Sequence, residues 1–292
     1  MSMSVGMIGV GLMGHGIAHN LVKKGFAVSF LEHPGNQPVA DLVSGGAIAC
    51  QSTAEVAARA DVVIICVTGA PQVEAVVTGA GGLLEGLKPG TIVVDCSTSL
   101  PETTARIAPL VQARGAKFLD APMTRLAKEA REGRLNLLVG GDAAVLDAVR
   151  PVLDAFCENI TRVGPVGAGH RMKLLHNFVS VGTMTLISEA AAHAATSGID
   201  MKAFVDVLAK GGGNGVALDR LTPSMLEGDP SRVAFTLVNG LKDLSYYVEM
   251  AKASGARAEV ASAITATLKG QVDAGHAEDY VPELVRLLQV ER

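Results

Sequence analysis

The sequence has 292 residues, of which 49% are hydrophobic and 18% are charged. This apolar content is enough for a full core and excludes an intrinsically disordered chain. The 25 basic and 29 acidic side chains give a net charge of −4, which argues against nucleic acid and anionic membranes as partners.

The first half of the chain alternates short β-branched runs with helical patterns. Strands that are apolar on both faces and separated by helices are typical of a parallel sheet covered on both sides. Because such crossovers are right-handed, the expected fold class is α/β with an N-terminal, doubly wound parallel sheet. The expected strands are residues 5–9, 27–31, 62–67, 91–95, 117–120, 136–139 and 160–163, and the expected helices are residues 13–24, 53–59, 71–77, 101–114 and 143–156.

The strand patterns disappear after about residue 164. A long Ala- and Leu-rich segment follows at residues 172–197, and it predicts a long interdomain helix. We therefore expect an α/β domain at residues 1–164 and an all-α domain at residues 165–292. Further helices are expected at residues 201–210, 231–255 and 260–270.

The cysteines give no sign of a metal or disulfide framework, because no CxxC pair occurs. The first lysine is Lys23, so the N-terminus resembles neither a secretory signal nor a transit peptide. No apolar run reaches the length of a membrane span. We therefore expect a cytoplasmic protein. The four cysteines are Cys50, Cys66, Cys96 and Cys157.

From the last residue of the first expected strand, the sequence reads Gly9-Val-Gly11-Leu-Met-Gly14 and leads into the first expected helix. The pattern GxGxxG is weak alone but is typical of a dinucleotide-binding, Rossmann-type domain when it joins a strand to a helix. Its glycines permit a tight turn and the close approach of a pyrophosphate to the helix N-terminus. The alternative is that they only make a tight turn.

Glu32 ends the second expected strand. A carboxylate at this place hydrogen-bonds to the ribose 2′-hydroxyl of NAD and repels the 2′-phosphate of NADP. The next residues, His33 and Pro34, do not supply the arginine that is typical of NADP binding. We therefore predict NAD as the cofactor and leave NADP open. The alternative for Glu32 is a solvated carboxylate at a strand end.

Five motifs, taken together and in this order, resemble the β-hydroxyacid dehydrogenase family over nearly the whole chain. The family includes 3-hydroxyisobutyrate dehydrogenase, tartronate semialdehyde reductase and succinic semialdehyde reductase. The motifs are the glycine loop, Asp95-Cys-Ser97-Thr98, Asp120-Ala-Pro122, the segment 164–177, and Leu241-Lys242-Asp243-Leu244. The cofactor-binding residues that the resemblance implies are Gly9, Gly11, Leu12, Met13, Gly14, Glu32, Val67, Thr68, Thr98 and Lys242.

Lys173 and Asn177 carry the predicted chemistry, and their spacing places them on one face of a helix. A lysine can protonate a developing alkoxide, or take the proton back in the oxidation direction. An asparagine beside it can hold a substrate by donating and accepting hydrogen bonds. A lone lysine near a helix start is ordinarily a solvated charge. The resemblance favours Lys173 as the catalytic acid and base and Asn177 as a substrate-binding residue.

Three other polar features have ordinary interpretations. His176 is expected to pack or to face solvent, and the pair Lys242–Asp243 also suits a charged helix turn. His15 and His19 are four residues apart, as in a metal-binding pair, but no third ligand is evident nearby. We therefore predict no metal.

The substrate motif departs from the family's pattern. The family continues after Asp-Ala-Pro with Val-Ser-Gly-Gly, whereas this chain has Met123-Thr124-Arg125-Leu126. Thr124 keeps the hydroxyl and is a predicted substrate-binding residue. Arg125 either grips an anionic group of the substrate through two parallel hydrogen bonds or only changes the shape of the loop. The departure leaves the natural substrate open.

The sequence therefore predicts an NAD-dependent oxidoreductase that transfers a hydride between nicotinamide and a small 3-hydroxy acid or its semialdehyde. The alternatives are a semialdehyde reductase for tartronate semialdehyde, succinic semialdehyde or glyoxylate and, less favoured, a non-catalytic NAD(H)-sensing protein. With the resemblance, we expect residues 1–164 to bind the cofactor and residues 165–292 to contribute to substrate binding and to the contacts between subunits. It also implies a homodimer or a homotetramer.

Overall fold

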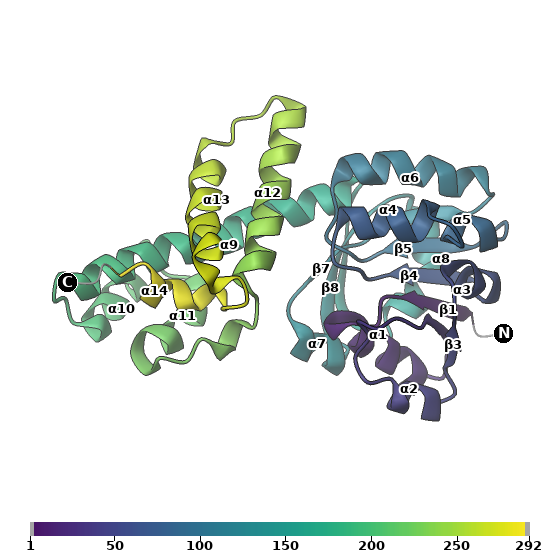
Figure 1. The fold of residues 1–292 in the computed structure, drawn as a ribbon, viewed down its shortest axis with the longest axis horizontal. Coiled ribbons are helices and arrows are strands. Elements are labelled where there is room, and N and C mark those ends of the chain that lie inside the picture. The colour runs from purple at the N-terminus through teal and green to yellow at the C-terminus, as the bar shows by residue number, and fades with distance from the viewer. Residues whose placement is uncertain (1–2, 290–292) are drawn as a thin grey trace. The chain divides into compact units, whose positions relative to one another are not determined.

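The computed structural model describes residues 3–289, and the chain divides into two compact units. The first unit ends at Lys173 and the second begins at Leu174, inside helix α9 (Ala168–Thr196). Figure 1 shows that the first unit is built on a sheet and that the second unit consists of helices.

Among the described residues, nine strands form one sheet in the first unit. Their order is β3-β2-β1-β4-β5-β6-β8-β7, with β9 paired to β8. All neighbours from β3 to β6 are parallel, which confirms the predicted α/β class and its doubly wound sheet. The strands are β1 (Ser4–Ile8), β2 (Ala27–Leu31), β3 (Ile48–Cys50), β4 (Val62–Ile65), β5 (Ile92–Asp95), β6 (Lys117–Asp120), β7 (Met123–Thr124), β8 (Leu135–Gly140) and β9 (Cys157–Gly164).

Strand β4 lies at the centre of the sheet because it is apolar on both faces, and all four of its residues are buried. Val62 and Ile64 belong to one hydrophobic cluster, whereas Val63 and Ile65 belong to a second. Since successive side chains of a strand point to opposite faces, the two clusters cover the two sides of the sheet.

The helices of the first unit form two groups. Helix α1 contacts α2 and α7, whereas α4 contacts α5 and α6, as Figure 1 shows for the second group. Helix α3 begins with a side-chain cap, because the hydroxyl of Ser52 accepts a hydrogen bond from the N–H of Glu55. The helices are α1 (Leu12–Lys23), α2 (Ala40–Ser44), α3 (Thr53–Arg59), α4 (Ala70–Thr78), α5 (Leu83–Gly86), α6 (Pro101–Ala113), α7 (Ala127–Glu132) and α8 (Ala143–Leu153).

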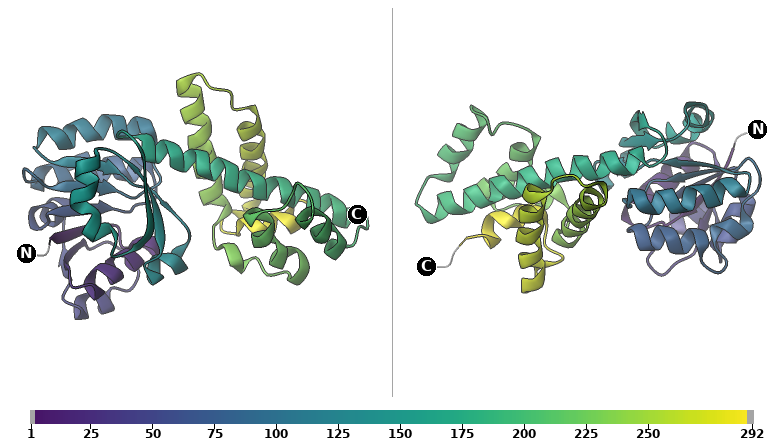
Figure 2. Two further views of the ribbon diagram at one scale, coloured as in Figure 1. Left: turned by 180° about the vertical axis from the view of Figure 1, so that it is seen from behind. Right: turned by 90° about the horizontal axis from the view of Figure 1, so that it is seen from above.

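The second unit is helical in its described residues, apart from one isolated bridge between Thr236 and Tyr280. Its core includes Ile187, Leu244 and Leu268. Figure 2 shows α9 as the longest helix from two further directions. The later helices are α10 (Met201–Ala209), α11 (Val216–Glu227), α12 (Leu237–Ser254), α13 (Glu259–Gln271) and α14 (Leu284–Leu287), with short turns η1 (Ser231–Val233), η2 (Val272–His276) and η3 (Val281–Glu283).

Three sequence expectations need correction. The last part of the sheet is mixed, because β8 runs antiparallel to β6 and β7 but parallel to β9. The expected helix at 231–255 begins only at Leu237, since Ser231–Val233 forms a separate short turn. Helix α9 begins four residues earlier than expected, at Ala168. The structure also contains seven elements that the sequence patterns did not predict: β3, β7, α2, α5, α7, α11 and α14.

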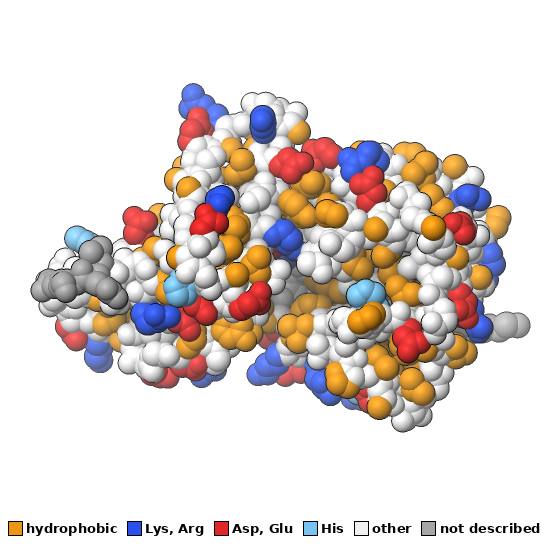
Figure 3. Space-filling model, viewed as in Figure 1, with side chains coloured by type: hydrophobic (Ala, Val, Ile, Leu, Met, Phe, Trp, Pro, Cys, Tyr) orange, Lys and Arg blue, Asp and Glu red, His pale blue; other side chains and the backbone are white. Residues whose placement is uncertain are grey.

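The surface carries charges of both signs, as the nearly balanced numbers of acidic and basic residues predict. Acidic and basic side chains are interspersed on the face that Figure 3 shows. None of the described helices has both the length and the apolar character needed to cross a membrane.

Candidate active site

The glycine loop joins β1 to α1, and the protein's own packing requires two of its three glycines. Gly9 has a φ of +94°, and a Cβ there would lie 2.2 Å from the carbonyl oxygen of Cys66. A Cβ on Gly14 would lie 2.0 Å from the carbonyl oxygen of Gly9. Neither position can carry a side chain, so both need glycine whether or not a ligand binds.

Gly11 is different, because nothing in the protein excludes a side chain there. Its φ is −76°, and the nearest atom to an added Cβ is the carbonyl oxygen of Gly35, at 3.9 Å. Gly11 is the N-cap of α1, the first turn holds no acidic residue, and Leu12 is 63% exposed. An open helix N-terminus with no carboxylate beside it suits a pyrophosphate. The glycine loop, including Leu12 and Met13, therefore fits the dinucleotide that its motif implies.

Glu32 follows directly after β2, and its side chain is exposed. Its carboxylate accepts a hydrogen bond of 2.6 Å from Nε2 of Gln51. Asn36, which the sequence analysis missed, accepts a hydrogen bond from the N–H of Val10 and donates one to the carbonyl of Leu31. The ends of β1 and β2 are thus tied together beside Glu32. An asparagine after a His-Pro-Gly turn was the available signal.

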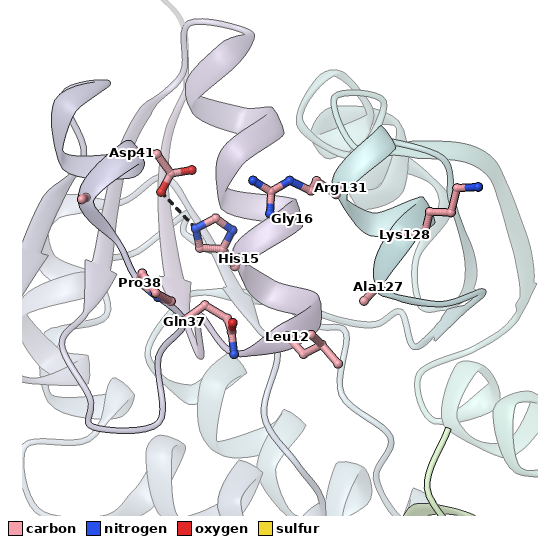
Figure 4. A pocket seen from close by; sticks show the side chains of 10 residues that line it. Leu12, His15, Gly16, Gln37, Pro38, Asp41, Ala127, Lys128 and Arg131 are labelled. Atoms are coloured by element: carbon pink, nitrogen blue, oxygen red, sulfur yellow. Dashed lines mark hydrogen bonds and ion pairs between the residues drawn. The ribbon is translucent and has the colours of Figure 1, made fainter. Parts of the chain in front are cut away.

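A pocket of about 630 Å³ lies along α1, lined by residues of α1, of α7 and of the chain entering α2 (Figure 4). On one side of it, Asp41 forms hydrogen bonds with Nε2 of His15 and Nδ1 of His19, at 3.0 and 3.2 Å. Burial raises the pKa of Asp41, but the two histidine hydrogen bonds outweigh it and lower the pKa overall. Among residues 3–289, no group of three metal-binding side chains occurs. The pocket shares Leu12 with the predicted cofactor residues.

The motif that begins at Asp95 lies at the end of β5. Oδ1 of Asp95 accepts a hydrogen bond from the N–H of Ser97, and the hydroxyl of Ser97 accepts one from the N–H of Val67, at 2.9 and 3.0 Å. Thr98 is half-buried and Thr68 is exposed. Because the carboxyl ends of parallel strands share one edge of a sheet, the glycine loop, Val67 and Thr98 lie along the same edge.

Asp120 and His170 are both fully buried. Oδ1 of Asp120 accepts a hydrogen bond from the N–H of Gly167, and Oδ2 accepts one from the N–H of His170, at 2.7 and 2.8 Å. Burial raises the pKa of Asp120, while His170 and the backbone hydrogen bonds oppose that rise. Asp120 begins the segment that resembles the family's substrate motif, and its carboxylate is enclosed and holds the start of α9. Sequence reasoning missed His170 altogether.

Lys173 and Asn177 both lie on α9, where their spacing places them on one side of the helix. Nδ2 of Asn177 donates a hydrogen bond to Oδ2 of Asp243, and Nδ1 of His176 lies 2.9 Å from Oδ1 of Asn177. Nζ of Lys242 lies 3.3 Å from Oδ1 of Asp243. Asp243, which the sequence analysis named only as a neighbour of Lys242, therefore joins two predicted site residues.

In the loop after Pro122, one residue that is not glycine adopts a backbone conformation that usually favours glycine. Arg125 has a φ of 80°, the only positive value at a non-glycine residue in the described chain. Its guanidinium forms an ion pair with Glu158 and donates a hydrogen bond to the carbonyl of Arg134. The hydrogen bond from Arg125 lowers the pKa of Glu158. These contacts favour the loop-shaping alternative for Arg125.

Thr124 lies in β7, beside this loop, and is buried. Its hydroxyl oxygen lies 3.3 Å from Nδ2 of Asn136, which donates the hydrogen bond. The proton of the Thr124 hydroxyl therefore remains available for another acceptor, as the predicted contact with substrate requires.

Two family models together match almost the whole chain. Residues 4–164 match the NAD binding domain of 6-phosphogluconate dehydrogenase. Residues 167–288 match the model described as NAD-binding of NADP-dependent 3-hydroxyisobutyrate dehydrogenase.

Individual relatives cover similar lengths. The chain is 31% identical over 252 residues to 2-(hydroxymethyl)glutarate dehydrogenase of Eubacterium barkeri. The aligned region covers 86% of this chain and 83% of that protein. The chain is also 31% identical over 280 residues to NAD-dependent L-serine dehydrogenase of Pseudomonas aeruginosa, with 94% of each protein covered. A structure of 3-hydroxyisobutyrate dehydrogenase of Mycobacterium tuberculosis with L-serine matches with a TM-score of 0.89 at 26% identity, over 99% of this chain and 100% of that one.

Proposed function

The chain belongs to the β-hydroxyacid dehydrogenase family, and from this premise we propose that it oxidises small 3-hydroxy acids with NAD, or reduces their semialdehydes. The family makes it an NAD(P)-dependent oxidoreductase that acts on CH–OH groups.

The relatives support the proposed substrate class. 3-Hydroxyisobutyrate, L-serine and 2-(hydroxymethyl)glutarate all carry a CH2OH group on carbon 2, next to a carboxylate, and they differ only in the other substituent of carbon 2. We expect this chain to require the first two features and to select on the third. The alternatives are reduction of tartronate semialdehyde, succinic semialdehyde or glyoxylate.

The cofactor would be held mainly by residues 1–164. The glycine loop offers N–H groups to the pyrophosphate, and Glu32 accepts hydrogen bonds from the ribose. When bound, NAD supplies the hydride acceptor for oxidation, and NADH supplies the hydride for reduction. We propose that Lys242, in residues 165–292, adds a positive charge to this cofactor site. The remaining residues proposed to contact the cofactor are Leu12, Met13, Val67, Thr68 and Thr98.

Lys173 would act as the general acid and base that transfers the proton of the substrate hydroxyl. In the oxidation direction its neutral amine takes the proton of the substrate hydroxyl, and in the reduction direction its ammonium returns a proton to the alkoxide oxygen. The positive charge also stabilises that oxygen as negative charge develops on it. The observation that carries this proposal is the pairing of Lys173 with Asn177 on one side of α9.

Asn177 and Thr124 would bind the substrate. Asp243 accepts one amide hydrogen of Asn177 and so fixes the direction of the amide group, which leaves a second hydrogen for a substrate oxygen. Arg125 is tied to Glu158, so it is proposed to shape the loop that carries Thr124.

The substrate proposal is tested by a rate screen. The oxidation arm uses NAD with L-serine, 3-hydroxyisobutyrate and 2-(hydroxymethyl)glutarate, and 2-hydroxypropanoate serves as the control with the alcohol on the wrong carbon. The reduction arm uses NADH with tartronate semialdehyde, succinic semialdehyde and glyoxylate. A kcat/KM for 2-hydroxypropanoate that equals the best 3-hydroxy acid would contradict the proposed class.

The role of Lys173 is tested by Lys173→Ala. The variant should lose about 10²–10⁴-fold in kcat, the usual contribution of a positioned acid and base. Its NADH dissociation constant, measured by fluorescence titration, should stay within about twofold, because the backbone amides and carboxylate proposed to grip the cofactor are intact. Arg171→Ala is the matched control, since it removes an exposed cation from the same turn of α9.

We also propose a cytoplasmic homodimer or homotetramer. Helix α9 exposes Leu175, Val179 and Leu186, the last to 67%, along the part that belongs to the second unit. Apolar side chains of this size on one helix favour contact with a second copy. Light scattering after gel filtration tests this, and Leu186→Lys should shift the mass toward the monomer. A monomeric parent would contradict it.

A further inference from the structure

The start of α9 is held by two fully buried residues, Asp120 and His170, which we call the Asp120–His170 clamp. A helix leaves its first N–H groups without partners inside the helix, and a carboxylate beside them is stabilised by the helix dipole. The carboxylate of Asp120 accepts two of these hydrogen bonds. Because Asp120 is the last residue of β6, the bonds fasten α9 to the sheet.

Two glycines show how closely this turn of the helix is packed. A Cβ on Gly169 would lie 2.4 Å from the carbonyl oxygens of Asp120 and Leu138. A Cβ on Gly140 would lie 2.5 Å from Oδ1 of Asp120 and 2.7 Å from the N–H nitrogen of Gly169. Backbone therefore meets backbone on both sides of the carboxylate, and the first turn of α9 has no room to shift toward β6 or β8.

His170 connects the same turn to the loop after β5. Its Nε2 donates a hydrogen bond of 3.2 Å to the carbonyl of Ser97, because a carbonyl can only accept. Its Nδ1 lies 2.7 Å from the hydroxyl oxygen of Thr104 on α6. Ser97 precedes Thr98 and accepts a hydrogen bond from the N–H of Val67. One imidazole thus links α9 to two of the predicted cofactor residues through Ser97.

We propose that the Asp120–His170 clamp positions Lys173 by fixing the height and rotation of the first turn of α9 relative to the loop 95–98. Lys173 lies three residues beyond His170, less than one helical turn from the fixed point, so little movement is left to its backbone. Asp120 and His170 are positioning residues, since both are enclosed by the protein. The inference rests on the proposed role of Lys173 as acid and base.

The alternative is that these contacts serve folding alone, and the two roles predict different measurements. A contact used only for folding changes the stability of the variant but not the kcat of its folded fraction. A positioning contact changes kcat in the folded fraction, because a displacement of about 1 Å can cost about 10²-fold in rate.

The test compares Asp120→Asn with Asp142→Asn. Asp142 also caps a helix with its carboxylate, accepting hydrogen bonds from the N–H groups of Ala144 and Val145 on α8. Asparagine caps as well as aspartate at an exposed helix start, so Asp142→Asn should behave like the parent. In Asp120→Asn, by contrast, the asparagine has only one acceptor oxygen for the two buried N–H groups of Gly167 and His170.

Four quantities are measured for each variant: melting temperature, NADH dissociation constant, kcat on the best substrate, and deuterium uptake of the peptide 165–172. For Asp120→Asn we expect a kcat about 10–100-fold lower and faster deuterium uptake in that peptide, with NADH affinity within about twofold. For Asp142→Asn all four should match the parent.

A second pair of variants tests His170 by conservative rescue. The amide of His170→Gln can donate to the carbonyl of Ser97 and accept from the hydroxyl of Thr104, whereas His170→Leu can do neither. The kcat should therefore fall more in His170→Leu than in His170→Gln, at equal saturation with NADH.

Parent-like kcat in both folded Asp120→Asn and folded His170→Leu would overturn the inference. If neither variant folds, deuterium uptake of the peptide 165–172 in the parent protein tests the inference instead. Rapid uptake there would show that the first turn of α9 is not held and would overturn the inference. The proposed function fails separately, through an active Lys173→Ala, while the exchange of this peptide still reports on the clamp.

Discussion

Two buried aspartates, one in each unit, hold residues of the proposed active site in different ways. Asp120 accepts hydrogen bonds from backbone N–H groups only, those of Gly167 and His170. Asp243, which is 2% exposed, accepts a hydrogen bond from the side chain of Asn177 and forms an ion pair with Lys242. The first aspartate places a helix, and the second orients two side chains on their own helices.

The difference predicts which kinetic parameter each aspartate controls. A displaced helix carries Lys173 with it, so a change at Asp120 should appear in kcat. A released Asn177 amide still lies on a correctly placed helix, so a change at Asp243 should appear mainly in KM for the substrate.

Asp243→Asn should have a larger effect on the kinetics than the changes at Glu32 and Arg125 described next. We expect kcat/KM for the substrate to fall about 10–100-fold, the equivalent of about 1.5–3 kcal/mol for a hydrogen bond to a charged group. Steady-state kinetics measure this. In a double-mutant cycle with Asn177→Ala the two losses should not add, because the residues are in contact, whereas Asp120→Asn with Asn177→Ala should add. Additive losses for the first pair would contradict the contact.

Glu32, also in the first unit, differs from Asp120 because its carboxylate is exposed. Glu32→Gln should narrow the preference for NAD over NADP by about tenfold, the equivalent of one charge-assisted hydrogen bond. The KM for the hydroxy acid should not change. Equal kcat/KM values for the two cofactors in the parent, unchanged in the variant, would remove this role.

The pH dependence of unfolding separates a buried aspartate from an exposed one. The pKa of Asp120 is raised, so the parent should lose stability relative to Asp120→Asn as the pH rises above 3.8, until it passes the folded-state pKa. The pKa of Asp41 is lowered, so its contribution is present above pH 3.8 and is lost as the pH falls through the folded-state pKa.

Urea unfolding across acidic pH, on the parent, Asp120→Asn and Asp41→Asn, measures both slopes. The contribution of the exposed Asp41 pair should stay below about 1 kcal/mol. The two aspartates should give slopes of opposite sign, and slopes of the same sign would contradict the described burial.

Arg125 should show the smallest effect, because its charge is paired with Glu158 within the first unit. Arg125→Gly removes the ion pair but relieves a non-glycine residue at a φ of 80°. We expect the melting temperature and the KM for the best anionic substrate to stay close to the parent values. A KM rise of more than about tenfold, specific for the charged substrate over its neutral aldehyde analogue, would restore the alternative in which Arg125 grips the substrate.

Much of the first unit was predictable from local patterns. The run of four buried residues in β4 has no polar face, so its position and its place inside the sheet follow from composition alone. Helix α3 has the predicted bounds, because Ser52 and Glu55 give it a recognisable start. Short elements such as β7 and α7 carry too few residues for a periodic signal.

The clamp could not be predicted, because its contacts are far apart in the sequence. His170 meets Ser97 and Thr104 across 73 and 66 residues, and Asp120 across 50. Gly169 precedes the helix expected at residues 172–197, but it lies inside α9, where a Cβ would come within 2.4 Å of the carbonyl oxygens of Asp120 and Leu138. Long-range packing, and not helix propensity, decides where α9 begins.

The central claim is that the amine of Lys173 handles the proton, and chemical rescue tests it most directly. Lys173→Ala is assayed at saturating NADH with the best semialdehyde, with and without added ethylamine, which supplies the missing amine in solution. The account predicts a kcat about 10²–10⁴-fold below the parent that rises with ethylamine concentration, and no rise in the parent or in Lys173→Arg. A Lys173→Ala variant whose kcat lies within a few-fold of the parent without any amine would contradict it.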